Sequence, residues 1–243
     1  MQLVREVPSV SGPFFEPTFQ PELQGAHHPQ LVSDAAGRQW VKKSLPARGM
    51  LAEAVGALLG QHLGVPVPQF ATFDDREAGK GWLSSYVTHV MHWQQKRVQD
   101  LDNFDDLGKL LVLDALIYNE DRNSENIIVE PGDEAESFSF WAIDMEAALV
   151  SRPRDFASKR SKSPDPFALP VGFSAASLDH SIARTVERAA QLPDATLEAL
   201  VRAAVEAAGV RDERVLYEAL RLRCRGAAGI VEDYLRRLAE RPA

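Results

Sequence analysis

The chain has 243 residues, of which 45% are hydrophobic, and this is enough for a sizeable core in one large domain or two small lobes. Its formal net charge is −8, which argues against a protein that holds nucleic acid through the phosphate backbone. No stretch approaches the roughly 20 apolar residues of a membrane span, and the N-terminus has no apolar signal core. Cys224 is the single cysteine, which excludes an intramolecular disulfide and a cysteine-based zinc site. We therefore expect a cytoplasmic protein without a membrane span.

The first part of the chain has the pattern of a small β-rich lobe. Proline and aromatic residues alternate near the N-terminus, β-patterned runs flank the turn at Gly37, and an apolar helical run ends at Gly64. The expected elements are an extended arm (1–24), a hairpin (30–33 with 38–43), a helix (50–63) and a strand (82–87).

From Asn103 onward the pattern becomes mainly helical. A long segment, 151–172, is rich in Ser, Arg, Lys and Pro without any period, and it predicts a mobile loop. The expected elements are a helix (104–118), two strands (127–129 and 138–143) and C-terminal helices (177–191, 194–208 and 212–239). The whole pattern predicts an α+β fold with a β-rich N-lobe, about 1–88, and a larger helical C-lobe, about 89–243. A cleft between two lobes is a common place for a ligand.

A polar loop after the helix 104–118 carries the strongest chemical signal. Asp121 lies in it, Asn126 follows five residues later, and Asp144 ends the second of the two strands. Protein kinases use an Asp, an Asn five residues on and a further Asp one hairpin downstream. In that arrangement Asp121 would orient the acceptor hydroxyl and take its proton, and Asn126 and Asp144 would offer the oxygen ligands that Mg²⁺ prefers.

Each of these three residues also has a structural interpretation. Asp121 and Asn126 are typical turn residues, and Asp144 is a typical helix N-cap. The functional interpretation gains weight from the predicted hairpin, because a hairpin over 127–143 would bring Asn126 and Asp144 to the same end of the sheet.

Two lysines on a predicted strand are candidates for contact with nucleotide phosphates. The run is Trp40-Val41-Lys42-Lys43, and the alternation of a strand directs only one lysine into the cleft. We favour Lys42, with Lys43 as the alternative. Glu53 interrupts the apolar helix 50–63 and would pair with the lysine, although a solvated position on the helix surface is an equal alternative.

Two further segments are candidate nucleotide contacts. Gly25, Ala26, His27 and His28 precede the first strand and would place backbone amides over the phosphates, although a single glycine is a weak signal. A zinc site at the two histidines is not favoured, because neither a cysteine nor a third histidine is nearby. The backbone of Ser85, Tyr86 and Val87 would meet the adenine at the connection between the lobes.

At these residues the chain resembles the HipA-like kinases, which are related to the phosphatidylinositol-kinase-like group and more remotely to protein kinases. The family pattern Asn-x-Asp-Arg-x-x-x-Asn, followed by a hairpin and Ile-Asp, is matched by Asn119, Asp121, Arg122, Asn126 and the pair Ile143–Asp144. Further similarity lies in three upstream segments: 25–31, Val41–Lys42, and Glu53 with 63–68. The ordered matches span about residues 25–144.

The chain departs from the family in two respects. Asn123 stands where many relatives have His, and the resemblance implies a short form without the separate N-terminal subdomain of the HipA toxins. The resemblance implies a bilobal protein-kinase-like fold that uses ATP and Mg²⁺.

The leading functional prediction is an ATP- and Mg²⁺-dependent phosphotransferase whose acceptor is a protein Ser or Thr hydroxyl, or a small molecule. The alternatives are a nucleotide-binding interaction module without transfer activity and an AMP transferase. The segment 151–172 carries four serines among five basic residues, which is typical either of an acceptor-binding or self-phosphorylated loop or of a solvated connector.

Overall fold

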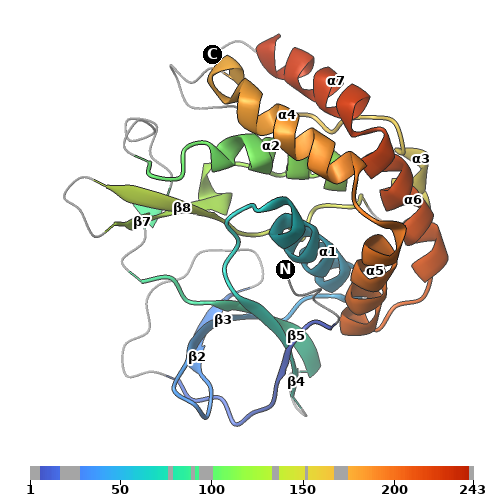
Figure 1. Ribbon diagram of the computed structural model, residues 1–243. Helices are drawn as coiled ribbons and strands as arrows, with labels where there is room; N and C mark the ends of the chain where they lie inside the picture. Colours follow the sequence, from blue (N-terminus) through green and yellow to red (C-terminus); the bar gives the residue numbers. More distant parts are fainter. Residues whose placement is uncertain are drawn as a thin grey trace.

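A five-stranded sheet lies at one end of the molecule and helices make up the other end (Figure 1). The computed structural model describes residues 6–16, 28–75, 79–88, 91–92, 101–132, 137–150, 153–166 and 175–240. The predicted α+β fold class is confirmed.

The described strands form two sheets. The larger sheet has the order β1-β4-β5-β3-β2, and a second sheet has the order β6-β7-β8. The strands are β1 (Ser9–Val10), β2 (Gln30–Ser33), β3 (Gln39–Lys43), β4 (Phe70–Asp75), β5 (Gly79–Ser85), β6 (Met91–His92), β7 (Ile127–Pro131) and β8 (Phe138–Ala142). The helices are α1 (Ala47–Leu63), α2 (Asp106–Ile117), α3 (Pro153–Ser158), α4 (Asp179–Ala190), α5 (Asp194–Ala208), α6 (Glu213–Arg225) and α7 (Ala227–Ala239), with short 3₁₀ turns η2 (Ser124–Asn126) and η3 (Ala175–Leu178).

The predicted hairpin of β2 and β3 is present, and its turn is held by one buried carboxylate. Asp34 accepts hydrogen bonds from the backbone of Ala36 (2.9 Å) and Arg38 (3.0 Å) and from the indole nitrogen of Trp40 (3.1 Å). These bonds and the left-handed Gly37 (φ 78°) fix the turn, so the register of β3 is set before the strand reaches its two lysines.

The two faces of the larger sheet meet different surroundings. Trp40 packs on one face with Val32, Ala71, Phe73 and Leu83 in a small apolar cluster. The opposite face turns toward α1. Because side chains alternate along β3, neighbouring residues of this strand must point into different environments.

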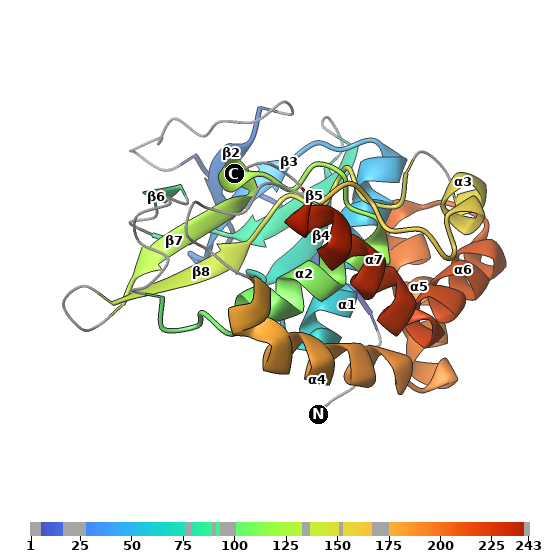
Figure 2. The same ribbon diagram turned by 90° about the horizontal axis from the view of Figure 1, so that it is seen from above.

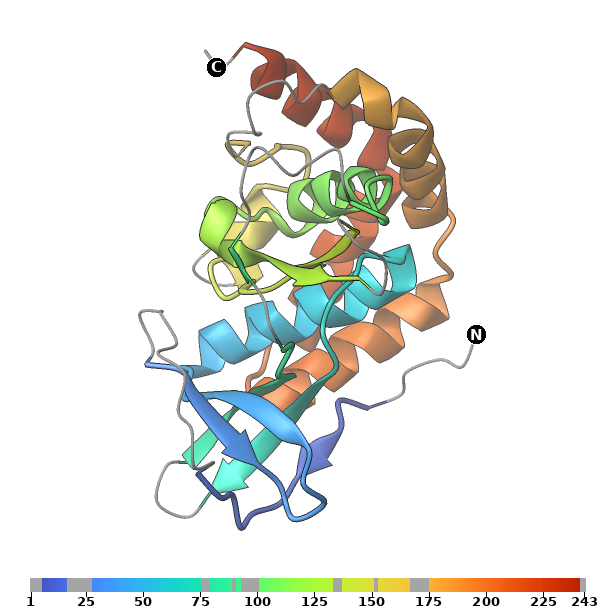
Figure 3. The same ribbon diagram turned by 90° about the vertical axis from the view of Figure 1, so that its left-hand side faces the viewer.

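Helix α1 lies between the sheet and the remaining helices and is buried almost throughout. It contacts α2 and α5, and Figure 3 shows α1 and α5 side by side. Its residues belong to the large core that continues into the helical part of the molecule. A helix that is apolar on all sides is expected in such a central position. The predicted lobe boundary near residue 88 remains a prediction.

Three expectations about elements need correction. Residues 212–239, predicted as one helix, form α6 and α7, which are separated at Gly226. Residues 153–158 are helical in a segment predicted to be a mobile loop, because a stretch without periodicity can still be held by distant helices. Residues 70–75 form β4, a strand that was absent from the expected elements. Among the described residues, no helix has both the length and the hydropathy needed to cross a bilayer.

The described part of the N-terminal arm packs on the sheet, as predicted. Strand β1 pairs in parallel with β4, and Phe15 forms an isolated bridge with Ser33. Residues 1–5 and 17–24 of the predicted arm lie outside the described residues.

Gly56 allows α1 to approach the segment after β8 closely. A β-carbon at this position would lie 2.9 Å from the β-carbon of Met145. We expect Gly56→Ala to lower the free energy of unfolding by about 1–3 kcal/mol through overpacking. Gly229→Ala in α7 is the matched control, since no described residue outside the backbone of α7 lies within 4 Å of the added atom. This variant should gain about 0.5–1 kcal/mol from helix propensity in the same urea titration, and equal values for the two variants would contradict the proposed packing.

Candidate active site

The hairpin of β7 and β8 brings two of the predicted site residues to the same end of the sheet (Figure 2). Ile127 and Ala142 form the last pair of this ladder. Asn126 precedes Ile127 and Ile143 follows Ala142, so both residues lie just beyond the last pair. The backbone N–H of Ile143 donates to the carbonyl of Asn126 (3.1 Å). Asn126 and Asp144 therefore lie next to this shared end, as the predicted hairpin required.

Arg122 ties the loop 119–126 to helix α2 and to the end of β8. Its side chain is fully buried and donates to both oxygens of Asp114 (3.0 and 3.1 Å). One of its terminal nitrogens donates to the carbonyls of Asn126 and Ile143, both at 2.7 Å. Burial lowers the pKa of Arg122, but the charge of Asp114 outweighs this effect and raises the pKa, so the guanidinium stays charged. The fork shape of Arg suits this two-sided contact.

Asn119 adds a third group to the buried ion pair. Its side-chain amide donates to Asp114 (2.9 Å), and its oxygen accepts the backbone N–H of Asp121 (3.2 Å). The carboxylate of Asp114 lies on α2 and is completely buried. Asp114 was not among the predicted site residues, and its signal in the sequence is a charged residue inside an otherwise apolar helical run.

Asp121 and Asn126 are oriented by the backbone of the same loop. The amide nitrogen of Asn126 donates to the carbonyl of Asp121 (2.8 Å), and Asn123 donates to the same carbonyl (3.0 Å). Because the side-chain nitrogen of Asn126 makes the bond to Asp121, its side-chain oxygen is not directed at the carbonyl of Asp121. Asp121 is exposed, so its carboxylate can be reached from solvent.

A lysine on β3 joins two carboxylates from distant parts of the chain. The ammonium group of Lys43 lies 3.3 Å from Glu53 on α1 and 3.3 Å from Asp144 beyond β8. The second oxygen of Glu53 accepts the backbone N–H of Met145 (3.2 Å). These contacts connect the sheet, α1 and the end of the β7–β8 hairpin.

The expectation that Lys42 pairs with Glu53 is wrong, because Lys43, the alternative, makes this pair. Lys42 shares a face of β3 with Trp40, and its ammonium group lies 4.6 Å from the ring centre of Phe73 and 5.4 Å from that of Phe14. The buried Trp40 lies on the face of β3 that packs in the small apolar cluster, and Lys42 lies on the same face. Lys43, the next residue, therefore lies on the opposite face, toward Glu53 and Asp144.

Charge balance in this group favours a protonated lysine. Burial lowers the pKa of Lys43, but the carboxylates of Glu53, Asp144 and Glu146 outweigh it, and the pKa is raised. Burial raises the pKa of Glu53; Lys43 opposes this shift and the negative charge of Asp144 adds to it. The pair of Lys43 and Glu53 is therefore stabilised mainly because its two charges neutralise each other. The three carboxylates together outnumber the one ammonium group.

The residues near Asp144 have the chemistry of a divalent cation site. Carboxylate oxygens of Glu53, Asp144 and Glu146 lie within 4.8 Å of one another. One oxygen of Asp144 is buried and has no hydrogen-bond partner among the described residues. Mg²⁺ prefers such oxygen ligands and often takes only one or two of them from the protein. Glu146 was not among the predicted site residues, and its signal in the sequence is its position two residues after Asp144.

The predicted nucleotide contacts are described only in part. Gly25, Ala26 and His27 lie outside the described residues. His28 is exposed, with a left-handed backbone (φ 45°), just before β2. At the end of β5, Ser85 and Tyr86 use their N–H groups for bonds to Gln69 (2.7 Å) and Gln39 (3.0 Å), and Val87 follows them.

A small hollow connects the end of β5 with the charged group. Val67, Phe70 and Trp82 form its apolar side, and Glu53 and Asp144 lie at its polar side. The hollow combines an apolar wall with charged side chains, which is the composition of a ligand site, but its volume of about 20 Å³ is far smaller than that of a nucleotide pocket.

The fold is similar to that of a solved kinase structure. The proinflammatory kinase CtkA of Helicobacter pylori matches with a TM-score of 0.61 and 12% sequence identity, over 97% of this chain and 100% of that chain. No family model matches the sequence, and no curated protein matches it either. At this identity the similarity establishes the fold, and the predicted bilobal kinase-like fold is confirmed.

Removal of one member of the buried Asp114–Arg122 pair should be strongly destabilising. Asp114→Ala leaves the guanidinium buried without its carboxylate, and we expect a loss of about 3–5 kcal/mol in the free energy of unfolding. The control is Arg202→Gln, which breaks an exposed pair with Glu213 (3.5 Å) and should leave stability unchanged. Equilibrium unfolding in urea measures the free energy of unfolding of both variants. A similar small change in both would contradict the importance of the buried pair for stability.

Proposed function

We propose that this protein is a HipA-like kinase that transfers the γ-phosphate of ATP to a hydroxyl acceptor in a Mg²⁺-dependent reaction. The observation that carries the proposal is the contact of Lys43 with both Glu53 and Asp144, next to the hairpin end that holds Asn126. A kinase-like fold with this arrangement supports phosphoryl transfer, a reaction that depends on positioning and charge neutralisation.

Asp121 is the proposed base and aligner of the acceptor hydroxyl. Its side chain is exposed while its own carbonyl is held by Asn123 and Asn126. The carboxylate can therefore meet an incoming hydroxyl from a backbone that is already fixed, and it can take the proton as the oxygen attacks the phosphorus.

Asn126 and Asp144 are the proposed Mg²⁺ ligands, with Glu146 as a third candidate. One oxygen of Asp144 is buried without a partner among the described residues, and Asn126 uses its side-chain nitrogen for the bond to Asp121, so both residues can offer an oxygen to such an ion. When bound, the ion would neutralise charge on the phosphates. Asp144 also stays in contact with Lys43, which holds its carboxylate in place.

Lys43 is the proposed contact for the α- and β-phosphates, and Glu53 positions it. Its raised pKa keeps it cationic at neutral pH, despite burial. The apolar hollow beside Trp82 and the chain at Ser85–Val87 is the proposed adenine site, and residues 25–28 are proposed to cover the phosphates.

The first test follows the γ-phosphate. We expect Mg²⁺-dependent release of ADP from ATP by the purified protein, with water or the protein itself as acceptor, and a fall of at least about 10²-fold in Asp121→Asn and Asp144→Asn. Wild-type rates in both variants would exclude the proposal.

Two further results would favour the alternative functions. A thermal shift with ATP and Mg²⁺ but no transfer would favour a binding module. Transfer of label from α-labelled but not γ-labelled ATP would favour AMP transfer.

The second test uses the two neighbouring lysines as a matched pair. Lys43→Met should weaken ATP binding and reduce ADP release by about 10²-fold or more, because it removes the cation between Glu53 and Asp144. Lys42→Met removes a lysine from the opposite face of the same strand and should retain both properties. A larger loss in the Lys42 variant would reverse the assignment.

A further inference from the structure

Residues 153–166, called the basic segment below, are held by an arginine from α6. Arg223 is completely buried and donates to the carbonyl of Lys159 in this segment. Its other nitrogens donate to the carbonyls of Ala115 and Leu116 at the end of α2, both at 2.6 Å. The aromatic ring of Phe156 lies 5.3 Å from the guanidinium. The basic segment is thereby fixed to the helix that precedes the loop 119–126.

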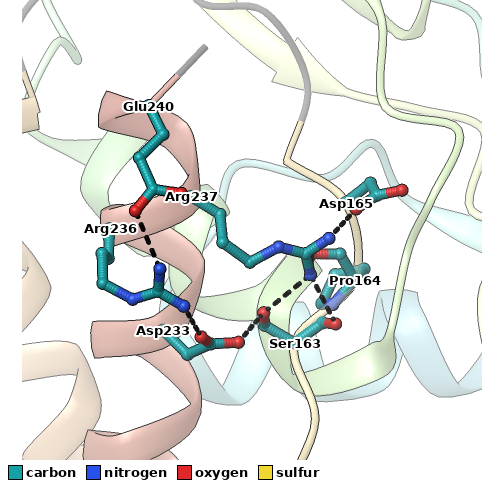
Figure 4. A network of polar contacts seen from close by, with 7 residues as sticks. All are labelled: Ser163, Pro164, Asp165, Asp233, Arg236, Arg237 and Glu240. Carbon is teal, nitrogen blue, oxygen red and sulfur yellow. Dashed lines mark hydrogen bonds and ion pairs between the residues drawn. The ribbon is translucent and has the colours of Figure 1, made fainter.

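A second arginine, from α7, holds the other end of the basic segment (Figure 4). Arg237 donates to the carbonyls of Ser163 (3.2 Å) and Pro164 (3.0 Å) and pairs with Asp165. The hydroxyl of Ser163 is buried and donates to Asp233 (2.5 Å). Ser163 is therefore part of an anchor and not an exposed modification site, and the basic segment is held both at its middle, by Arg223, and near its C-terminal end, by Arg237.

The basic segment borders the loop that carries Asp121. The ammonium group of Lys159 lies 5.4 Å from the ring centre of Tyr118, the residue that ends α2 and immediately precedes the loop. Through Arg223, the carbonyl of Lys159 is also connected to the last turn of α2. A molecule that meets Asp121 thus has this segment as a neighbouring surface.

Three cations on the basic segment are directed into solvent. Arg154, Arg160 and Lys162 are exposed, and none forms an ion pair with another described residue. The acidic residue Asp165 is already paired with Arg237, and Asp155 is the remaining acid of the segment. A cluster of uncompensated positive charge in a chain of net charge −8 is a local feature that favours an anionic partner.

We propose that the basic segment is the acceptor-binding surface and selects peptide segments that carry carboxylates or phosphates near the acceptor hydroxyl. The inference rests on the proposed phosphotransferase function and specifies its acceptor. The cations are distributed over α3 and the turn that follows it, so several anionic groups along an extended chain match them better than one compact anion. The two arginine anchors keep the surface in place, which reduces the ordering cost of binding.

The test measures binding of three fluorescent serine peptides, flanked by Glu, Gln or Lys, in the absence of ATP. We expect the Glu-flanked peptide to bind about tenfold more tightly than the Lys-flanked one, and high salt should reduce the difference. Changing Arg154, Arg160 and Lys162 together to Glu should abolish the preference. The matched control changes Lys80, Arg184 and Arg202 to Glu, which alters the net charge equally at exposed positions on β5, α4 and α5 and should keep the preference.

Defined results would overturn the inference. These are the absence of a preference for the Glu-flanked peptide, a preference that survives reversal of the three basic residues, or binding to phosphatidylserine–phosphatidylcholine vesicles without binding to peptides. If the reversed variant does not fold, as judged by circular dichroism, the same positions changed to Gln provide the comparison.

Peptide binding without ATP separates this inference from the proposed function. If the wild type shows no Mg²⁺-dependent ADP release, the kinase proposal is contradicted, and the peptide preference can still be measured. Conversely, faster or equal phosphorylation of the Lys-flanked peptide by an active kinase would overturn only the assignment of the basic segment.

Discussion

The buried contact between Arg122 and Asp114 is the constraint on which the site depends. The guanidinium joins α2, the carbonyl of Asn126 and the carbonyl of Ile143, so one side chain sets the distance between the loop 119–126 and the end of β8. A buried ion pair adds little net stability compared with apolar packing, because both charges lose their hydration. Its value here is geometric: neither Asn126 nor Asp144 can move far while these bonds persist.

The charged group around Lys43 adds a second constraint between distant elements. A cation on β3 holds Glu53 of α1 and Asp144 of the hairpin end at the same distance. Three carboxylates near one ammonium group leave an excess of negative charge, which a divalent cation would relieve and which raises the pKa of Glu53 further. The arrangement is therefore better explained by binding chemistry than by stability.

Local sequence patterns predicted the parts of the fold that local physics controls. The β2–β3 hairpin and the β7–β8 hairpin follow from turn residues and alternation, and the positions of Asn126 and Asp144 at one sheet end follow from the second hairpin. The choice between Lys42 and Lys43 did not follow, because alternation separates the two lysines but does not say which face meets α1. That decision needs the packing of Trp40, a contact with residues far away in the sequence.

The structure of residues 153–166 depends on still more distant contacts. Its sequence has no period, and its anchors, Arg223 and Arg237, lie on helices 64 and 74 residues further along the chain than the residues they hold. Arg223 donates to three main-chain carbonyls, and Arg122 and Arg237 each donate to two carbonyls and also pair with one carboxylate. Bonds to carbonyls fix the path of a segment and do not occupy the carboxylates of Asp121 and Asp144. Buried arginines beneath these acids therefore hold the backbone of the candidate site in place.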